Sequence, residues 1–128
     1  MNETLDQNVV DIINRPVFVV GCPRSGTTWL QRMLASHPDI WGGPESFFFD
    51  HFGSVVDNIN IEQTRARDLQ LLSYWKREDL IEKLRELWVQ TFYDIAREKQ
   101  FSVLSEKTPG HALKLANIDF LLPQARII

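Results

Sequence analysis

Cysteine is almost absent from this sequence of 128 residues, because Cys22 is the only one. A single cysteine excludes an intramolecular disulfide and a cysteine-rich zinc site. No base stands in a motif relation to Cys22, so we interpret it as a small space-filling residue and not as a nucleophile. The lack of disulfides is compatible with a reducing compartment, and we expect a cytoplasmic protein.

Strong net charge and long apolar runs are also missing. The chain has 14 Lys and Arg against 17 Asp and Glu, for a formal net charge of -3. This balance gives no bulk attraction to nucleic acid or to an anionic membrane, so we expect no nucleic-acid partner and only a local anion site. Residues 1–15 carry acidic side chains and no long apolar run, so we expect neither a secretory signal nor a membrane span.

Short apolar runs alternate with segments of helical periodicity. Strands are predicted over residues 17–20, 39–41, 101–104 and from 126 onward, and helices over 27–36, 64–72, 79–98 and 110–118. This alternation predicts an α/β fold in three layers, with a parallel β-sheet flanked by helices. The hydrophobic content of 44% is enough for one ordinary core, and no repeat or linker divides the chain.

Two segments carry more specific expectations. Residues 52–63 show no clear periodicity, so we predict a loop that faces the substrate. Asp79 and Glu82 are placed like a capping box at the start of the longest helix, in which Trp88 and Phe92 are expected to be core scaffold.

A glycine-rich turn, Gly21 to Gly26, joins the first predicted strand to the helix that follows. Such a turn surrounds an anion with backbone N–H groups and with the positive end of the helix dipole. Thr27 and Thr28 would add hydroxyl donors. A nucleotide-binding P-loop with this glycine spacing requires lysine where the chain has Thr27, which disfavours a kinase or NTPase. The turn is therefore predicted to bind a phosphate, but not a triphosphate with its metal.

Residues 23–30, Pro-Arg-Ser-Gly-Thr-Thr-Trp-Leu, strongly resemble the loop with which sulfotransferases hold the 5′-phosphosulfate of 3′-phosphoadenosine 5′-phosphosulfate (PAPS). Residues 44–50 and 105–109 resemble segments of bacterial and heparan-type sulfotransferases. The resemblance implies a P-loop-like fold in which residues 1–128 are the N-terminal part of a single sulfotransferase domain. We expect this domain to be incomplete at its C-terminus, because the family's contacts to the 3′-phosphate would lie beyond Ile128.

The resemblance also implies roles for individual residues. Glu45 would be the base that accepts the acceptor's proton, and Arg24 and Lys107 would be the cations that stabilise the leaving phosphate. The residues implied to bind the donor are Arg24, Ser25, Gly26, Thr27, Thr28 and Trp29. The implied reaction moves a sulfuryl group from PAPS to a hydroxyl of a small molecule, glycan or lipid and leaves PAP, the desulfated nucleotide. The sequence offers no metal-ligand cluster, and we expect no metal.

Other hypotheses remain open. A P-loop nucleotide kinase or NTPase is the second enzyme class, and a fragment that binds a nucleotide without turnover is the non-enzymatic one. His111 is a competing base, which we rank below Glu45 because the family's catalytic histidine stands closer to the lysine. We interpret Glu106 and Asp50 as hydrogen-bonding or exposed groups. Neither the acceptor nor the oligomeric state has a motif in the sequence.

Overall fold

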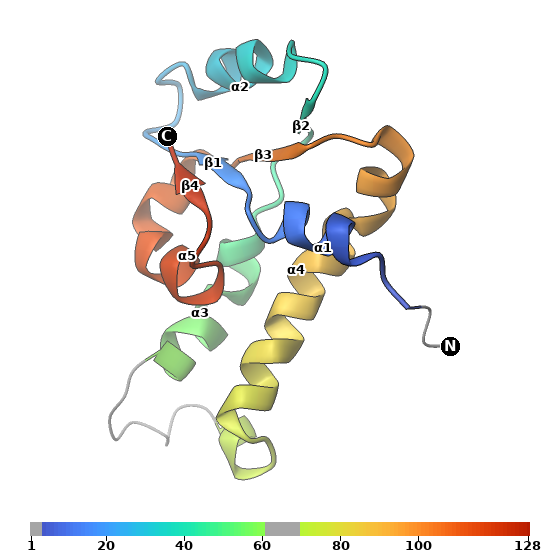
Figure 1. Cartoon of the computed structure of the whole chain (residues 1–128). Helices are drawn as coiled ribbons and strands as arrows, with labels where there is room; N and C mark the ends of the chain where they lie inside the picture. Colours follow the sequence, from blue (N-terminus) through green and yellow to red (C-terminus); the bar gives the residue numbers. More distant parts are fainter. Residues whose placement is uncertain (1–3, 61–69) are drawn as a thin grey trace.

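A computed structural model of the chain describes residues 4–60 and 70–128 (Figure 1). Its strands are β1 (Val17–Val19), β2 (Ile40–Gly42), β3 (Val103–Lys107) and β4 (Arg126–Ile127). Its α-helices are α1 (Gln7–Ile13), α2 (Thr27–Ala35), α3 (Phe48–Asn60), α4 (Arg77–Lys99) and α5 (Leu115–Leu121). Two short 3-10 helices are η1 (Gln70–Ser73) and η2 (Pro109–Lys114).

The strands form one parallel sheet in the order β2-β3-β1-β4. β1 lies beside β3, with Phe18 paired to Glu106 and Val19 paired to Lys107. Since parallel strands end at the same edge, the turn that follows β1 lies next to the residues that follow β3. The N–H of Gly21 donates to the carbonyl of Pro109 across this edge, at 3.1 Å. The carboxyl edge of the two central strands is therefore where bound molecules are expected in this class of fold.

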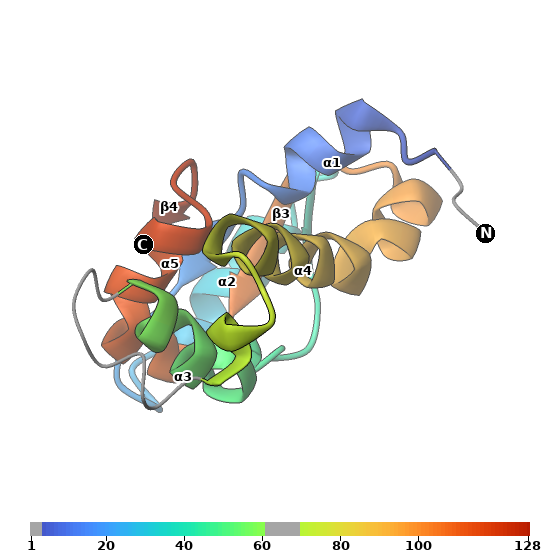
Figure 2. The same ribbon diagram turned by 90° about the horizontal axis from the view of Figure 1, so that it is seen from below.

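The sheet is covered on both faces, which confirms the predicted three-layer α/β arrangement. α2 lies over one face, where it packs on β2 and β3 (Figure 1). The other face carries α1, α3, α4 and α5, and Figure 2 shows α4 crossing beneath the sheet with α3 and α5 at its side. Neither α4 nor any other helix within the described ranges is long and apolar enough to cross a membrane.

Helix α3 occupies most of the segment for which we predicted a loop, so that prediction is wrong for residues 52–60. Its buried side consists of Phe48, Phe49, Gly53, Val56 and Ile59. These positions recur every three or four residues, which is the spacing of a helix face. Gly53 on the buried face, and polar residues such as Ser54 and Asp57 between the apolar ones, made the helical pattern weak. Burial of this face in the core stabilises α3 as a helix, although its local sequence pattern is weak.

Several other boundaries differ from the predictions. α4 begins at Arg77, and the side chain of its N-cap residue Lys76 forms no capping hydrogen bond, so the predicted capping box is wrong. β3 begins two residues later than predicted and extends through Lys107. The segment predicted as one helix at 110–118 is a 3-10 turn followed by α5. The helix predicted at 64–72 falls mainly on residues 61–69, outside the described ranges.

The core beneath the sheet is centred on Trp88 of α4, which is fully buried. Its ring lies 5.4 Å from the ring of Phe18, 5.1 Å from that of Phe48 and 4.8 Å from that of Phe92, measured between centroids. The indole N–H donates to the carbonyl of Ile13, at 2.8 Å. One side chain therefore joins α1, β1, α3 and α4, which confirms the expectation that Trp88 and Phe92 belong to the core.

We expect Trp88→Ala to lower the free energy of unfolding by about 3–5 kcal/mol, because it leaves a large cavity and an unpaired buried carbonyl. Leu87→Ala is the matched control on the same helix, since Leu87 is partly exposed, and its cost should stay below about 1 kcal/mol. Urea denaturation of both variants measures the difference. Similar losses from the two would contradict this account of the core.

Candidate active site

The turn between β1 and α2 is held by short-range hydrogen bonds. Ser25 donates its N–H to the carbonyl of Cys22, at 3.2 Å. Gly26 is the N-cap of α2 and has a φ of 91°, in the left-handed region that favours glycine. The N–H groups of the first helical turn, which begins at Thr27, have no intrahelical acceptors. The turn therefore presents N–H donors and the positive end of α2 to the space in front of it.

That space is a cavity of about 920 Å³. Its walls come from the turn and α2, from the segment that leads into α3, and from the residues that follow β3. The lining residues are Pro23, Arg24, Gly26, Thr27, Thr28, Trp29, Arg32, Glu45, Phe47, Asp50, Thr108, Pro109 and Gly110. Two arginines and two carboxylates thus share one cavity with a helix N-terminus.

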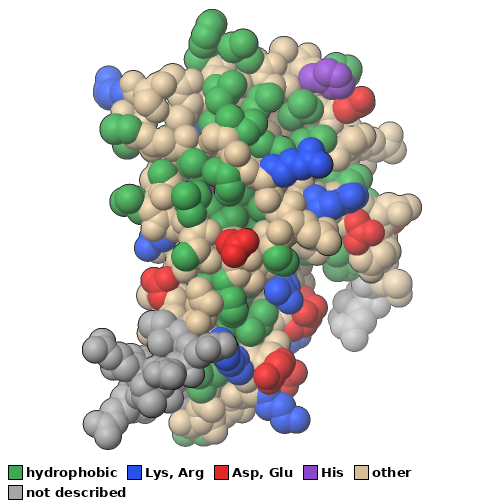
Figure 3. Space-filling model, turned by 60° about the vertical axis from the view of Figure 1, so that its left-hand side comes forward, with side chains coloured by type: hydrophobic (Ala, Val, Ile, Leu, Met, Phe, Trp, Pro, Cys, Tyr) green, Lys and Arg blue, Asp and Glu red, His purple; other side chains and the backbone are tan. Residues whose placement is uncertain are grey.

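Figure 3 shows one face of the molecule, where Lys and Arg side chains are interspersed with Asp and Glu and with apolar side chains. Charges of mixed sign produce no large field of one sign on that face.

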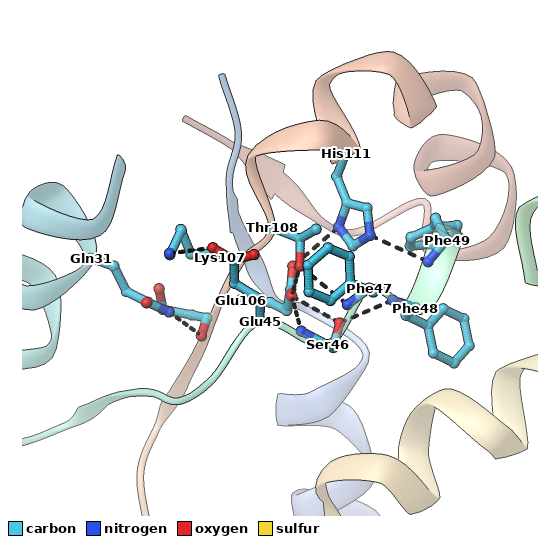
Figure 4. A network of polar contacts seen from close by, with 11 residues as sticks. Gln31, Glu45, Ser46, Phe47, Phe48, Phe49, Glu106, Lys107, Thr108 and His111 are labelled. Atoms are coloured by element: carbon cyan, nitrogen blue, oxygen red, sulfur yellow. Dashed lines mark hydrogen bonds and ion pairs between the residues drawn. The ribbon is translucent and has the colours of Figure 1, made fainter. Parts of the chain in front are cut away.

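Lys107, the last residue of β3, links the start of α2 to the segment before α3, and Figure 4 shows its contact with Glu45. Its ammonium donates to the Thr28 hydroxyl at 3.0 Å and to the Glu45 carboxylate at 2.6 Å. The side chain of Lys107 is 9% exposed and that of Glu45 is 31% exposed. An ion pair this sheltered is screened less than a surface pair. The structure thus brings together two of the residues predicted to act in the site.

Glu106, the neighbour of Lys107, points to the opposite face of the sheet, as strand alternation requires. Its carboxylate is buried and accepts hydrogen bonds from two residues at one oxygen: from the Ser46 N–H at 3.0 Å, the Ser46 hydroxyl at 2.8 Å and the Thr108 hydroxyl at 2.6 Å. The other oxygen lies 3.2 Å from Nδ1 of His111. This buried cluster and the Lys107 side chain lie on opposite sides of β3 (Figure 4).

The pKa of Glu106 is the balance of opposing effects. Burial raises the pKa, but the hydrogen bonds from His111, Thr108 and Ser46 lower it by more. The net pKa therefore lies below its usual value, and the carboxylate is ionised at neutral pH.

His111 is fully buried and both of its ring nitrogens are engaged. Nε2 accepts the N–H of Phe49 at 3.3 Å, so the ring proton is assigned to Nδ1, which donates to Glu106. A histidine in this state has no free lone pair for an acceptor proton.

The residues predicted to form the site meet at one place in the structure. Arg24, Glu45 and most of the turn line the cavity, and Ser25 lies in the turn beside them. Trp29 is 70% exposed and so presents its ring to the cavity side of α2. Cys22 is exposed, so our interpretation of it as a space-filling residue is wrong.

Sequence reasoning did not assign several of the lining residues to the site, among them Arg32, Phe47 and Asp50. Arg32 follows Thr28 by one helical turn, so helix periodicity places both on one face and was a usable signal. Phe47 has a φ of 52°, in the left-handed region that is strained for an aromatic residue. Nothing in the local sequence indicates that conformation.

Comparison with known proteins shows which family the sequence matches. The model of the sulfotransferase family matches residues 16–128. A curated relative, Nodulation protein NoeE of Sinorhizobium fredii (strain NBRC 101917 / NGR234), is 29% identical over 111 residues, which cover 84% of this chain and 26% of that protein. The chain thus spans about a quarter of the length of that relative.

We expect the Glu106 carboxylate to make the stability of the fold depend on pH in the acid range. Its pKa is lower in the folded protein than the ordinary value of 4.5. It therefore contributes stability above that value, and the contribution is lost as pH falls through the folded pKa. The difference in free energy of unfolding between the wild type and Glu106→Gln should stay constant above about pH 4.5 and shrink as pH falls below that value. Urea denaturation at each pH measures it, and a difference independent of pH would contradict this assignment.

Proposed function

The chain belongs to the sulfotransferase family, and from this premise we propose that it moves a sulfuryl group from PAPS to an acceptor hydroxyl, with PAP as the product. The observation that carries the proposal is the ammonium of Lys107, which contacts both the phosphate-type turn, through Thr28, and the carboxylate of Glu45. A cation, a helix N-terminus and a carboxylate in one cavity are the parts that such a transfer needs.

The donor's phosphosulfate would bind at the turn. The residues fit this group, because α2 presents unpaired N–H groups beside the Thr28 hydroxyl and because Arg24 lines the same cavity. The guanidinium of Arg24 can pair with two oxygens of a phosphate or sulfate. When bound, the donor supplies the sulfuryl group and a phosphate leaving group. The donor-binding role of Arg24, Ser25, Gly26, Thr27, Thr28 and Trp29 belongs to this proposal.

Lys107 would stabilise the charge that develops on the leaving phosphate oxygen. An ammonium has three N–H donors. The bonds to Thr28 and Glu45 occupy two of them within the described part of the chain. The third would bind an oxygen of the donor.

Glu45 would accept the proton of the attacking hydroxyl. Its carboxylate lines the cavity and is partly exposed, so an acceptor can approach it. The contact with Lys107 fixes one carboxylate oxygen and leaves the other for the acceptor. A carboxylate held within hydrogen-bond reach of a hydroxyl is a competent general base.

The acceptor would enter beside Phe47 and Asp50, on the wall of the cavity that faces the turn. An aromatic ring next to carboxylates suits an alcohol on a small molecule, a glycan or a lipid. The proposal also includes a cytoplasmic location. It includes no metal, because Arg24 and Lys107 would supply the positive charge that stabilises the leaving phosphate.

We expect Glu45→Gln to lower kcat by at least about 10²-fold, because the amide keeps the shape of the side chain but cannot accept a proton. Binding of PAP should change little. The assay follows PAP released from PAPS at saturating donor, with a panel of phenols, monosaccharides and fatty alcohols to select a working acceptor. Calorimetry with PAP measures donor binding separately.

Asp57→Asn is the matched control, since it makes the same chemical change on the exposed side of α3, and kcat should stay at the wild-type value. Full kcat in Glu45→Gln would remove Glu45 as the base. Turnover of ATP in place of PAPS would favour the nucleotide kinase alternative.

A further inference from the structure

Two consecutive residues of β3 each bind one of two consecutive residues before α3. Lys107 binds the side chain of Glu45 at 2.6 Å, and Glu106 binds the N–H and hydroxyl of Ser46 at 3.0 and 2.8 Å. The first contact involves Glu45, which lines the cavity, and the second is buried on the other side of β3 (Figure 4). The position of Glu45 is therefore defined from both sides of β3.

The buried contact extends over the whole entry into α3. The N–H of Phe47 donates to the Thr108 hydroxyl at 3.3 Å, that of Phe48 to the Ser46 hydroxyl at 3.2 Å, and that of Phe49 to Nε2 of His111 at 3.3 Å. These N–H groups belong to the start of the helix, where no intrahelical acceptor exists. Thr108 and His111, which follow β3 in the sequence, thus act together with the local cap Ser46 at the start of α3.

We infer that Glu106 is a positioning residue: through Ser46 it holds the carboxylate of Glu45 against Lys107, while Thr108 and His111 hold Glu106 in place. The inference rests on the proposed role of Glu45 as the base. Glu106 itself is buried and does not line the cavity, so it acts only through its neighbours.

Backbone geometry supports the view that Glu106 positions the segment before α3 and does not merely fill space in the core. Phe47 has a φ of 52°, which costs free energy for a side chain of this size. Its N–H is bound by Thr108, and the hydroxyl of Thr108 in turn donates to Glu106 at 2.6 Å. The strained backbone directly follows the residues that carry the base, so the cluster fixes this segment in a conformation that it would not adopt alone.

Ser46→Ala tests the inference with the smallest change. It removes the hydroxyl that joins Glu106 to the N–H of Phe48, but it leaves Glu106, His111 and Lys107 in place. Ser46→Thr restores a hydroxyl at a position where threonine also caps helices. Val89→Ala is a control for stability alone, because Val89 is buried on α4 away from this cluster.

The first measurement needs no substrate. A double-mutant cycle of Glu45→Gln and Lys107→Met, followed by urea denaturation, gives the coupling between the two side chains. We expect this coupling free energy to fall to less than about half of its wild-type value in the Ser46→Ala background. It should stay unchanged in the Ser46→Thr and Val89→Ala backgrounds. An undiminished coupling in Ser46→Ala would overturn the inference.

The second measurement is kcat with PAPS, together with KM for PAPS. We expect Ser46→Ala to lower kcat about tenfold or more, with KM for PAPS changed less than about twofold, because displacement of a reacting group costs rate more than donor binding. An equal loss of kcat in Val89→Ala would show that rate follows stability and would overturn the inference. If the wild type itself turns over no PAPS, the proposed function fails, and the coupling measurement still decides whether Glu106 positions Glu45.

Discussion

A carboxylate inside an apolar core must have its charge compensated, and this requirement organises the protein. Glu106 is 2% exposed, and its oxygens are satisfied by Ser46, Thr108 and His111. An unpaired charge there would cost more free energy than the net stability of a folded domain. The segment before α3 and the turn after β3 must therefore close around β3. The same closure places Glu45 beside Lys107 at the edge of the sheet.

The alternation of side chains along β3 divides the structure into a packed side and a side that carries the proposed site. Glu106 contacts His111 on the face of the sheet that it shares with Phe18, its partner in β1, whereas Lys107 contacts Thr28 and Glu45 on the other face. The side that carries the proposed site is built on a strand end and a helix N-terminus, which are rigid elements. Proposed donor-binding and proton-accepting groups are thus fixed by core contacts before any substrate arrives, as preorganised sites require.

Contiguous motifs in the sequence predicted the parts of the site that are local. The turn from Gly21 to Gly26, the buried strand before it and the helix after it follow from residue types in one short segment, and the structure has all three. The meeting of Glu45 with Lys107 followed only from resemblance to a family. The cluster around Glu106 joins residues about 60 positions apart, and a sequence alone does not show that Ser46 caps against β3. Helix α3 was missed for a related reason, because tertiary burial outweighed its weak local pattern.

The central claim is that the turn, Lys107 and Glu45 form one donor-binding and proton-accepting site. A crystal structure of the protein with PAP tests it most directly. The account predicts the 5′-phosphate at the N-terminus of α2, in contact with Lys107, while Ser46 stays hydrogen-bonded to Glu106. A 5′-phosphate bound away from the turn, or a bound state in which Glu45 has moved out of reach of the cavity, would contradict it.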